Sequence, residues 1–361
     1  MRAGCAVRCS LTIRDPRGGC QHAGTPRVLR RTSSPEGEVH WDRVRAALQG
    51  GVADAPPVAL WRHFPQHDQR AETCAQVHVA FWRRHGFDLL KVTPTSGYYG
   101  EDWGLRAAYR PNREGVRTYL DRPVKRGQDW ARLRPLDVTA GAYGRELRVL
   151  RLVREGVGPQ VPVLATVFSP LTVARTLSGD QAVLRYLREE PDRLHEGLEV
   201  IADVTSRFVA ACLGAGADGV FFATQMACAG AVTEEEYEAF GRPYDLRVLE
   251  AAAGAELVVL HAHGERPYLD LLADYPVHAF NWHDRRTPPS LREARQRTSA
   301  CLWGGVDEAT LADRSPDEVA REVRDALQQT AGRGHVVAGG CVIPIDTPPE
   351  NVDAVVQAAR G

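Results

Sequence analysis

Short, nearly continuous apolar runs alternate with longer amphipathic stretches along the chain from Trp41 onward. Eight such runs end in small or polar residues, and they cover residues 57–63, 88–93, 161–168, 219–223, 257–261, 277–282, 302–306 and 335–339. Continuous apolar runs of this length are typical of parallel strands that are buried on both faces. Eight strands that alternate with helices predict an α/β fold, a single (β/α)8 (TIM) barrel.

Four of the predicted helices begin at the pattern Ser/Thr-x-x-Glu, which is typical of a capping box. The patterns start at Thr233, Ser290, Ser315 and Thr347. In each, the hydroxyl oxygen can accept a hydrogen bond from an amide of the first helical turn, while the glutamate accepts one from the amide of the capping residue. These patterns predict where four helices start.

The second and third predicted strands are separated by residues 95–160, a connection about twice the ordinary length. We therefore expect a long insertion after the second strand. An open, doubly wound sheet is the alternative architecture. It is less favoured because no G-x-G-x-x-G sequence follows the first strand.

The amino-terminal residues differ from the rest of the chain. Residues 1–34 contain many arginines, a single acid, Asp15, and no helical or alternating apolar pattern. We predict a disordered basic tail over residues 1–38, dispensable for folding, and a barrel domain over residues 39–361. A transit peptide and a misassigned start codon are the alternative interpretations of this segment.

Composition narrows the class of protein. The 361 residues have a net charge of −1, 43% apolar and 25% charged residues, which is ordinary for a globular protein. The longest apolar runs are interrupted by polar residues, and basic patches with interleaved aromatics are absent, so neither a membrane nor a nucleic-acid partner is expected. Eight sparse cysteines indicate reduced thiols in a cytoplasm. Because lysine is confined to Lys91 and Lys125 while arginine is abundant, we infer a GC-rich, bacterial genome.

Residues that follow the strands of such a barrel converge on one mouth, where the active site of the fold lies. His261 and His263 lie two residues apart at the end of the fifth predicted strand, so strand alternation places both imidazoles on one face. Cys341 follows the eighth strand and can reach the same mouth. This set predicts a zinc site with one position open for a substrate. The competing interpretation is two hydrogen-bonded histidines and an inert buried thiol.

Other polar and aromatic residues follow the predicted strands. We predict catalytic roles for Arg62, Glu101 and His283. We predict contacts with a small-molecule substrate for Trp61, His63, Tyr98, Gln225 and Asn281. For the tryptophan, packing in the core is an equally good interpretation. For the glutamate, a solvated or capping role competes with acid/base chemistry.

Five parts of the chain resemble the uroporphyrinogen decarboxylase (URO-D) family, and the similarity covers roughly residues 41–360. They are residues 42–48, 169–172 with Gly179, 235–237 with 243–244, 261–264, and 341–344 with 347–351. The last is the most specific, because the decarboxylases have a similar Pro-x-x-Thr-Pro-x-Glu-Asn sequence there. Members of this family are (β/α)8 barrels, and they include tetrapyrrole decarboxylases and zinc-dependent corrinoid:thiol methyltransferases.

The chain departs from the decarboxylases at three places. Residues 61–66 match their Met-Arg-Gln-Ala-Gly-Arg segment in the first arginine, Arg62, but lack the second arginine. Residues 92–94, where their strand-2 aspartate would fall, contain no carboxylate, and Thr176 stands where they have a tyrosine. These differences count against uroporphyrinogen as the substrate.

The methyltransferase branch of the family is more similar at the mouth of the barrel. The resemblance implies zinc ligands at His261 and Cys341, with His263 in place of a cysteine, and a corrinoid carried by a partner protein. The favoured function is therefore an enzyme that transfers a methyl group from a methyl-corrinoid to a thiol. The alternatives are decarboxylation of uroporphyrinogen or a related substrate, with Arg62 holding a carboxylate, and a non-catalytic barrel that binds a corrinoid or another ligand.

Overall fold

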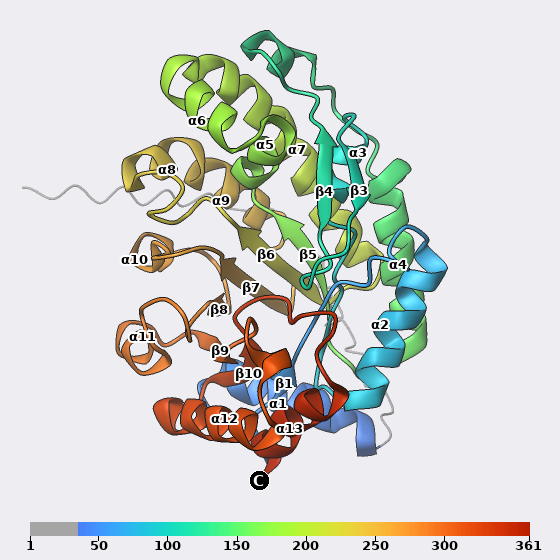
Figure 1. Ribbon diagram of the computed structural model, residues 1–361, viewed down its shortest axis with the longest axis vertical. Coiled ribbons are helices and arrows are strands. Elements are labelled where there is room, and N and C mark those ends of the chain that lie inside the picture. Colours follow the sequence, from blue (N-terminus) through green and yellow to red (C-terminus); the bar gives the residue numbers. More distant parts are fainter. Residues whose placement is uncertain (1–34) are drawn as a thin grey trace, which may run out of the picture. The chain divides into compact units, whose positions relative to one another are not determined.

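The computed structural model describes the backbone of residues 35–361 and the side chains from Val39 onward (Figure 1). Most of the predicted tail, residues 1–34, lies outside the described residues. The end of the predicted tail belongs to a helix, α1 (Pro35–Leu48), in which Val44 is fully buried. None of the helices from Pro35 onward is long and apolar enough to cross a membrane.

Eight parallel strands form the centre of the fold. They are β1 (Val58–Ala59), β2 (Leu90–Lys91), β5 (Val163–Phe168), β6 (Gly219–Thr224), β7 (Leu257–Ala262), β8 (Ala279–Trp282), β9 (Cys301–Val306) and β10 (His335–Gly339). Their order in the sheet is β1-β10-β9-β8-β7-β6-β5-β2. Each of the eight predicted runs overlaps one strand, so the barrel prediction is confirmed and the open doubly wound sheet is wrong.

Asp88 joins the two end strands of this sheet and nearly closes the barrel. Its backbone amide donates to the carbonyl of Val58 at 2.9 Å, and its side chain accepts from the Val58 amide at 2.9 Å. The carboxylate is buried and also accepts from Arg43 at 2.8 Å. These contacts satisfy the backbone groups that β1 and β2 leave unpaired at the seam.

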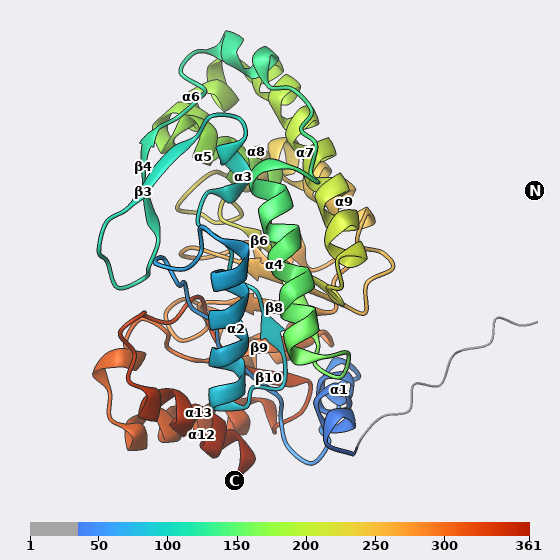
Figure 2. The ribbon, with the colours of Figure 1, turned by 90° about the vertical axis from the view of Figure 1, so that its right-hand side faces the viewer.

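Helices surround the barrel and cover its strands (Figures 1 and 2). They are α2 (Ala71–His85), α4 (Gly141–Val157), α5 (Pro170–Ser178), α6 (Asp180–Glu189), α7 (Pro191–Gly214), α8 (Glu234–Phe240), α9 (Arg242–Glu250), α10 (Leu269–Leu272), α11 (Leu291–Arg297), α12 (Pro316–Thr330) and α13 (Pro349–Arg360), with a 3-10 turn η2 (Leu311–Asp313). Helices α2 and α4 lie side by side (Figure 2). Cys74 of α2 and Leu150 of α4 belong to the same buried apolar cluster as Leu90 of β2 and Val163 of β5.

Three of the four predicted capping boxes are confirmed, at Thr233, Ser290 and Ser315. The fourth is wrong. Helix α13 begins after Pro348, and the Thr347 hydroxyl donates to the Pro344 carbonyl at 2.8 Å. Two consecutive prolines fix an extended entry into this helix, so the threonine caps a turn instead.

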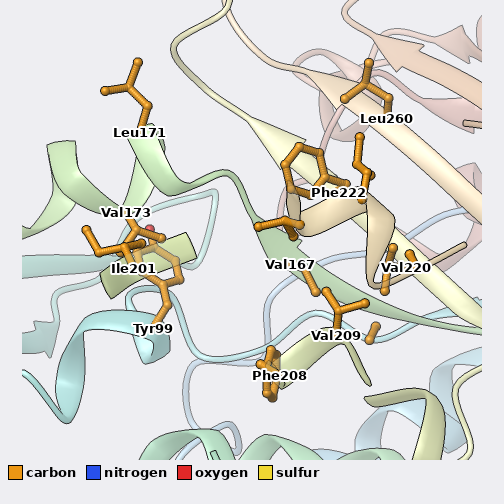
Figure 3. Packing of buried hydrophobic residues seen from close by; sticks show 14 of the residues in the cluster. Tyr99, Val167, Leu171, Val173, Ile201, Phe208, Val209, Val220, Phe222 and Leu260 are labelled. Atoms are coloured by element: carbon orange, nitrogen blue, oxygen red, sulfur yellow. The ribbon is translucent and has the colours of Figure 1, made fainter. Parts of the chain in front are cut away.

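Packing between the strands and the outer helices forms the largest apolar cluster. Val167 and Val220, on β5 and β6, point toward Phe208 and Val209 of α7 (Figure 3). All four side chains are almost completely buried. Burial of each stabilises the fold by about 1.5–3 kcal/mol. Packing against the outer helices therefore stabilises the strands, so the residues at the barrel mouth can be polar.

The predicted insertion after the second strand is confirmed. It contains α3 (Tyr98–Glu101), an antiparallel hairpin of β3 (Arg106–Tyr109) and β4 (Arg117–Asp121), and a 3-10 helix η1 (Gly127–Arg132) before α4. The tip of the hairpin packs on the barrel mouth. The Ile345 amide donates to the carbonyl of Arg113 at 2.7 Å, and a Cβ on Gly115 would lie 2.8 Å from the Cβ of His63. Only glycine allows this close approach.

Candidate metal centre and its cavity

A cavity of about 680 Å³ opens at the carboxyl ends of the barrel strands. Each strand, or the loop that follows it, contributes to its wall: Trp61, Lys91, Thr166, Phe221, His261, His283, Glu308 and Cys341. The tip of the hairpin adds Arg113 and Arg117 to the lining. This is the place where the fold positions an active site.

Four metal-capable side chains meet in this cavity, and we refer to them as the His3Cys cluster: His261, His263, His283 and Cys341. One ligand atom from each lies within 4.8 Å of the others. His263 Nδ1 is 3.1 Å from His283 Nε2 and 3.8 Å from Cys341 Sγ. The structure thus brings together the three predicted metal ligands and adds His283, which we predicted to be catalytic.

Asn281 sets the orientation of His261. Its side-chain amide donates to the carbonyls of Trp303 at 3.0 Å and Gly339 at 3.1 Å, so its oxygen must face His261. That oxygen accepts from His261 Nδ1 at 2.6 Å. The proton of the neutral imidazole therefore lies on Nδ1, and Nε2 presents its lone pair to the cluster.

Glu308 orients His283 in the same way. A carboxylate oxygen of Glu308 accepts from His283 Nδ1 at 2.6 Å, and the other oxygen accepts from the Gly340 amide at 3.1 Å. Because a carboxylate only accepts, His283 carries its proton on Nδ1 and directs Nε2 toward His263. Two of the four cluster residues are thus held in the tautomer that a metal ligand requires.

Burial sets the protonation of the cluster. Burial, together with the neighbouring His263 and His283, lowers the pKa of His261 well below its usual 6.5. Burial and then His283 lower the pKa of His263 to about 3. Burial raises the pKa of the Cys341 thiol to about 12, with Glu308 adding to the effect. At neutral pH the imidazoles of His261 and His263 are uncharged, and the Cys341 thiol needs a cation beside it to ionise. The donor set fits a borderline-soft divalent ion.

Of the predicted substrate contacts, Trp61, His63 and Gln225 line the cavity. Asn281 lies behind the wall and positions His261. Tyr98 is buried outside the lining, where its hydroxyl donates to the Thr166 carbonyl at 2.9 Å. The next residue, Tyr99, lines the cavity in its place.

The two other predicted catalytic residues are not brought to the cavity. Arg62 donates to the Ile345 carbonyl at 2.8 Å and packs over the rings of Phe64 and Phe81. Its neighbours Trp61 and His63 point inward, so strand alternation turns Arg62 away. Glu101 forms a bidentate ion pair with Arg145, whose two terminal nitrogens donate to its carboxylate oxygens at 2.9 and 3.0 Å. Both residues therefore make structural contacts outside the cavity lining.

Sequence reasoning missed two buried groups that face the cluster or its cavity, Glu308 and Lys91. A signal existed for both. Glu308 follows the end of β9 by two residues. Lys91 ends β2 and lies two residues before Thr93, so the two side chains point to the same side, and both line the cavity. The hairpin residues had no such signal, because they lie in the insertion.

Comparisons with known proteins agree with this geometry. The family described as uroporphyrinogen decarboxylase (URO-D) matches residues 42–361. A methylcobamide:CoM methyltransferase, MtaA of Methanosarcina barkeri, is 25% identical over 337 residues, 88% of this chain and 96% of its own length. A uroporphyrinogen decarboxylase of Crocosphaera subtropica is 25% identical over 349 residues, 87% of this chain and 94% of its own length.

Among solved structures, a methyltransferase from Methanosarcina mazei superposes with a TM-score of 0.78 at 22% sequence identity. The superposition covers 88% of this chain and 97% of the other, and it supports the barrel fold. Relatives with two different reactions thus match nearly the whole barrel, and they share its family. The chain belongs to the uroporphyrinogen decarboxylase (URO-D) family.

Proposed function

We propose that this protein is a zinc-dependent methyltransferase that moves a methyl group from a methyl-corrinoid, carried by a partner protein, to a thiol. The observation that carries the proposal is the His3Cys cluster inside a cavity of about 680 Å³ at the barrel mouth. The match to a methylcobamide:CoM methyltransferase over 88% of the chain supports this choice of reaction.

The residues present fit zinc. His261, His263 and Cys341 supply two nitrogens and one sulfur, and zinc takes four such ligands. His283 Nε2 and the sulfur of a substrate then compete for the fourth position. A bound zinc ion would supply the positive charge that keeps a substrate thiol ionised at neutral pH.

The protein's own groups hold this arrangement. Asn281 and Glu308 prevent the imidazoles of His261 and His283 from turning, so the lone pairs stay aimed at one point. Trp61 and Phe221 form an apolar floor, which excludes water from the reacting sulfur. His63 and Gln225 line the same space and contact the rest of the substrate.

Decarboxylation of uroporphyrinogen has less support. A polycarboxylated tetrapyrrole needs several free cations in the cavity, yet the lining arginines lie beside carboxylates of this chain, which leaves Lys91 alone among the described lysines and arginines of the lining. Thr93, on the β2 side of the cavity, offers a hydroxyl where a carboxylate would be needed to gather pyrrole NH groups. A barrel that binds a ligand without turnover is the other alternative, and an assay of methyl transfer separates it from the proposal.

The test is transfer of the methyl group of free methylcobalamin to 2-mercaptoethanol, monitored by the loss of the methyl-cobalt absorbance. We expect transfer that depends on added protein, stops with a zinc chelator and returns with zinc. The variant Cys341→Ser should lose the reaction, whereas Cys212→Ala, a buried cysteine of α7 outside the cavity lining, should keep it. Conversion of uroporphyrinogen, with no transfer to any thiol, would overturn the proposal.

A further inference from the structure

Lys91 places an amine at the floor of the cavity. It lies at the end of β2, its side chain lines the cavity, and it is 6% exposed. Its Nζ lies 5.4 Å from the ring centre of Trp61 and 4.8 Å from that of Phe221. Its one hydrogen bond goes to the Thr93 hydroxyl at 3.5 Å. Burial lowers the pKa of Lys91 to about 7, so keeping it charged in this place is costly.

The arginines that line the cavity all have carboxylates beside them. Arg113 pairs with Asp313 and Asp346, and Arg117 pairs with Asp68. The two other arginines of the lining also have a partner: Arg175 lies 2.5 Å from Asp180, and Arg286 lies 3.8 Å from Glu308. Among the described lysines and arginines that line the cavity, Lys91 is the one without a carboxylate partner.

The surroundings of Lys91 suit an oxyanion. The Thr93 hydroxyl accepts from Lys91, so its own proton is free to donate to a second atom. A buried ammonium beside a free hydroxyl and two aromatic rings is stabilised by a bound carboxylate, which supplies the missing charge and accepts both protons.

We propose that Lys91 and Thr93 form a binding subsite for a carboxylate-class oxyanion at one end of the substrate. The inference rests on the proposed function in one respect, since the other end of the same substrate is the thiol held at the His3Cys cluster. The methyl acceptor is then a compact mercapto acid, short enough for its sulfur and its carboxylate to lie in one cavity.

The first test compares two acceptors of equal length, 3-mercaptopropionate and its uncharged amide, 3-mercaptopropionamide, with methylcobalamin as donor. We expect wild-type protein to favour the acid in kcat/KM by about tenfold to a hundredfold, the range for a charge-assisted hydrogen bond. In Lys91→Met the ratio of acid to amide should fall to about one. Lys125→Met removes the one other lysine, an exposed residue paired with Asp121, and should keep the wild-type ratio.

A second test needs neither metal nor turnover. The chain contains two lysines, so limited acetylation with acetic anhydride and peptide mass analysis reads both in one experiment. We expect propionate to slow acetylation of Lys91 and leave Lys125 unaffected, while propionamide protects neither. This experiment uses wild-type protein, so it remains decisive if Lys91→Met does not fold.

The outcomes separate the two claims. Equal protection by propionate and propionamide, or an acid preference that survives in Lys91→Met, would overturn the subsite. Protection of Lys91 by propionate in a protein that transfers no methyl group would retain the subsite and overturn the proposed function alone.

Discussion

The two sides of the cavity are built from different parts of the chain. The metal side consists of the carboxyl end of β7 and the short loops after β7, β8, β9 and β10, which carry the His3Cys cluster and Glu308. The opposite side consists of β2, the residues that follow it and the β3–β4 hairpin, which carry Lys91, Thr93, Arg113 and Arg117. The metal side follows from the barrel pattern, whereas the opposite side depends on where an insertion folds back. The metal side is therefore suited to chemistry that a family shares, and the opposite side to the selection of a substrate.

The largest effect is expected from breaking the metal side at His263. We expect His263→Ala to weaken zinc binding by at least about 100-fold, more than the loss of a residue that only orients a ligand. His263→Cys, which supplies a thiolate in place of the imidazole, should bind zinc at least as tightly as wild type. Titration against a competing chelator measures both. Unchanged affinity in His263→Ala would remove this residue from the site.

A smaller loss is expected when a ligand remains but loses its support. Glu308→Gln keeps the shape of the side chain and removes the charge that fixes the proton on His283 Nδ1. We expect zinc affinity or methyl transfer to fall by about 10–100-fold, with little change in the far-UV circular dichroism. If activity and affinity both match wild type, Glu308 does not support the site.

Next to the hairpin, the pH dependence of the free energy of unfolding tests His63, which follows β1 and packs against Gly115. Burial lowers the pKa of His63 to about 3, from 6.5. Between these values the unfolded chain binds a proton that the folded chain does not, so the free energy of unfolding falls as the pH falls. For this one group the loss from pH 6.5 to about pH 5 is at most about 2 kcal/mol. Urea unfolding at about pH 7.5 and about pH 5 should show a smaller difference in His63→Asn than in wild type. An equal difference between the two pH values in both proteins would show that folding does not lower the pKa of His63.

The smallest effect is expected at the tip of the hairpin. Arg113 joins it to Asp313 at 2.9 Å and to Asp346 at 3.1 Å, and all three side chains are largely exposed. Arg113→Ala should leave the free energy of unfolding nearly unchanged, because ion pairs between exposed groups contribute little. The KM for the thiol should rise a few-fold, since the hairpin borders the cavity, while zinc content stays unchanged. A loss of zinc in this variant would show that the two sides are not independent.

The sequence predicted the barrel because buried parallel strands have a distinct apolar pattern. It also predicted His261, His263 and Cys341, since residues at strand ends share one rim. The same logic placed Arg62 in the site. Trp61 and His63 point inward, so the alternation of side chains after β1 turns Arg62 away from the cavity. Tyr98 is buried outside the cavity lining, and its neighbour Tyr99 lines the cavity. No pattern in the sequence predicted the hairpin, because the residues of its strands are exposed or half-buried and its position depends on contacts distant along the chain.

Elemental analysis of untagged protein shows whether the His3Cys cluster binds zinc. We expect about one zinc per chain in wild type, near-complete loss in Cys341→Ser, and wild-type content in the control Cys212→Ala. Wild-type protein that holds no zinc as purified, and still holds none after incubation with zinc and dialysis, would contradict it.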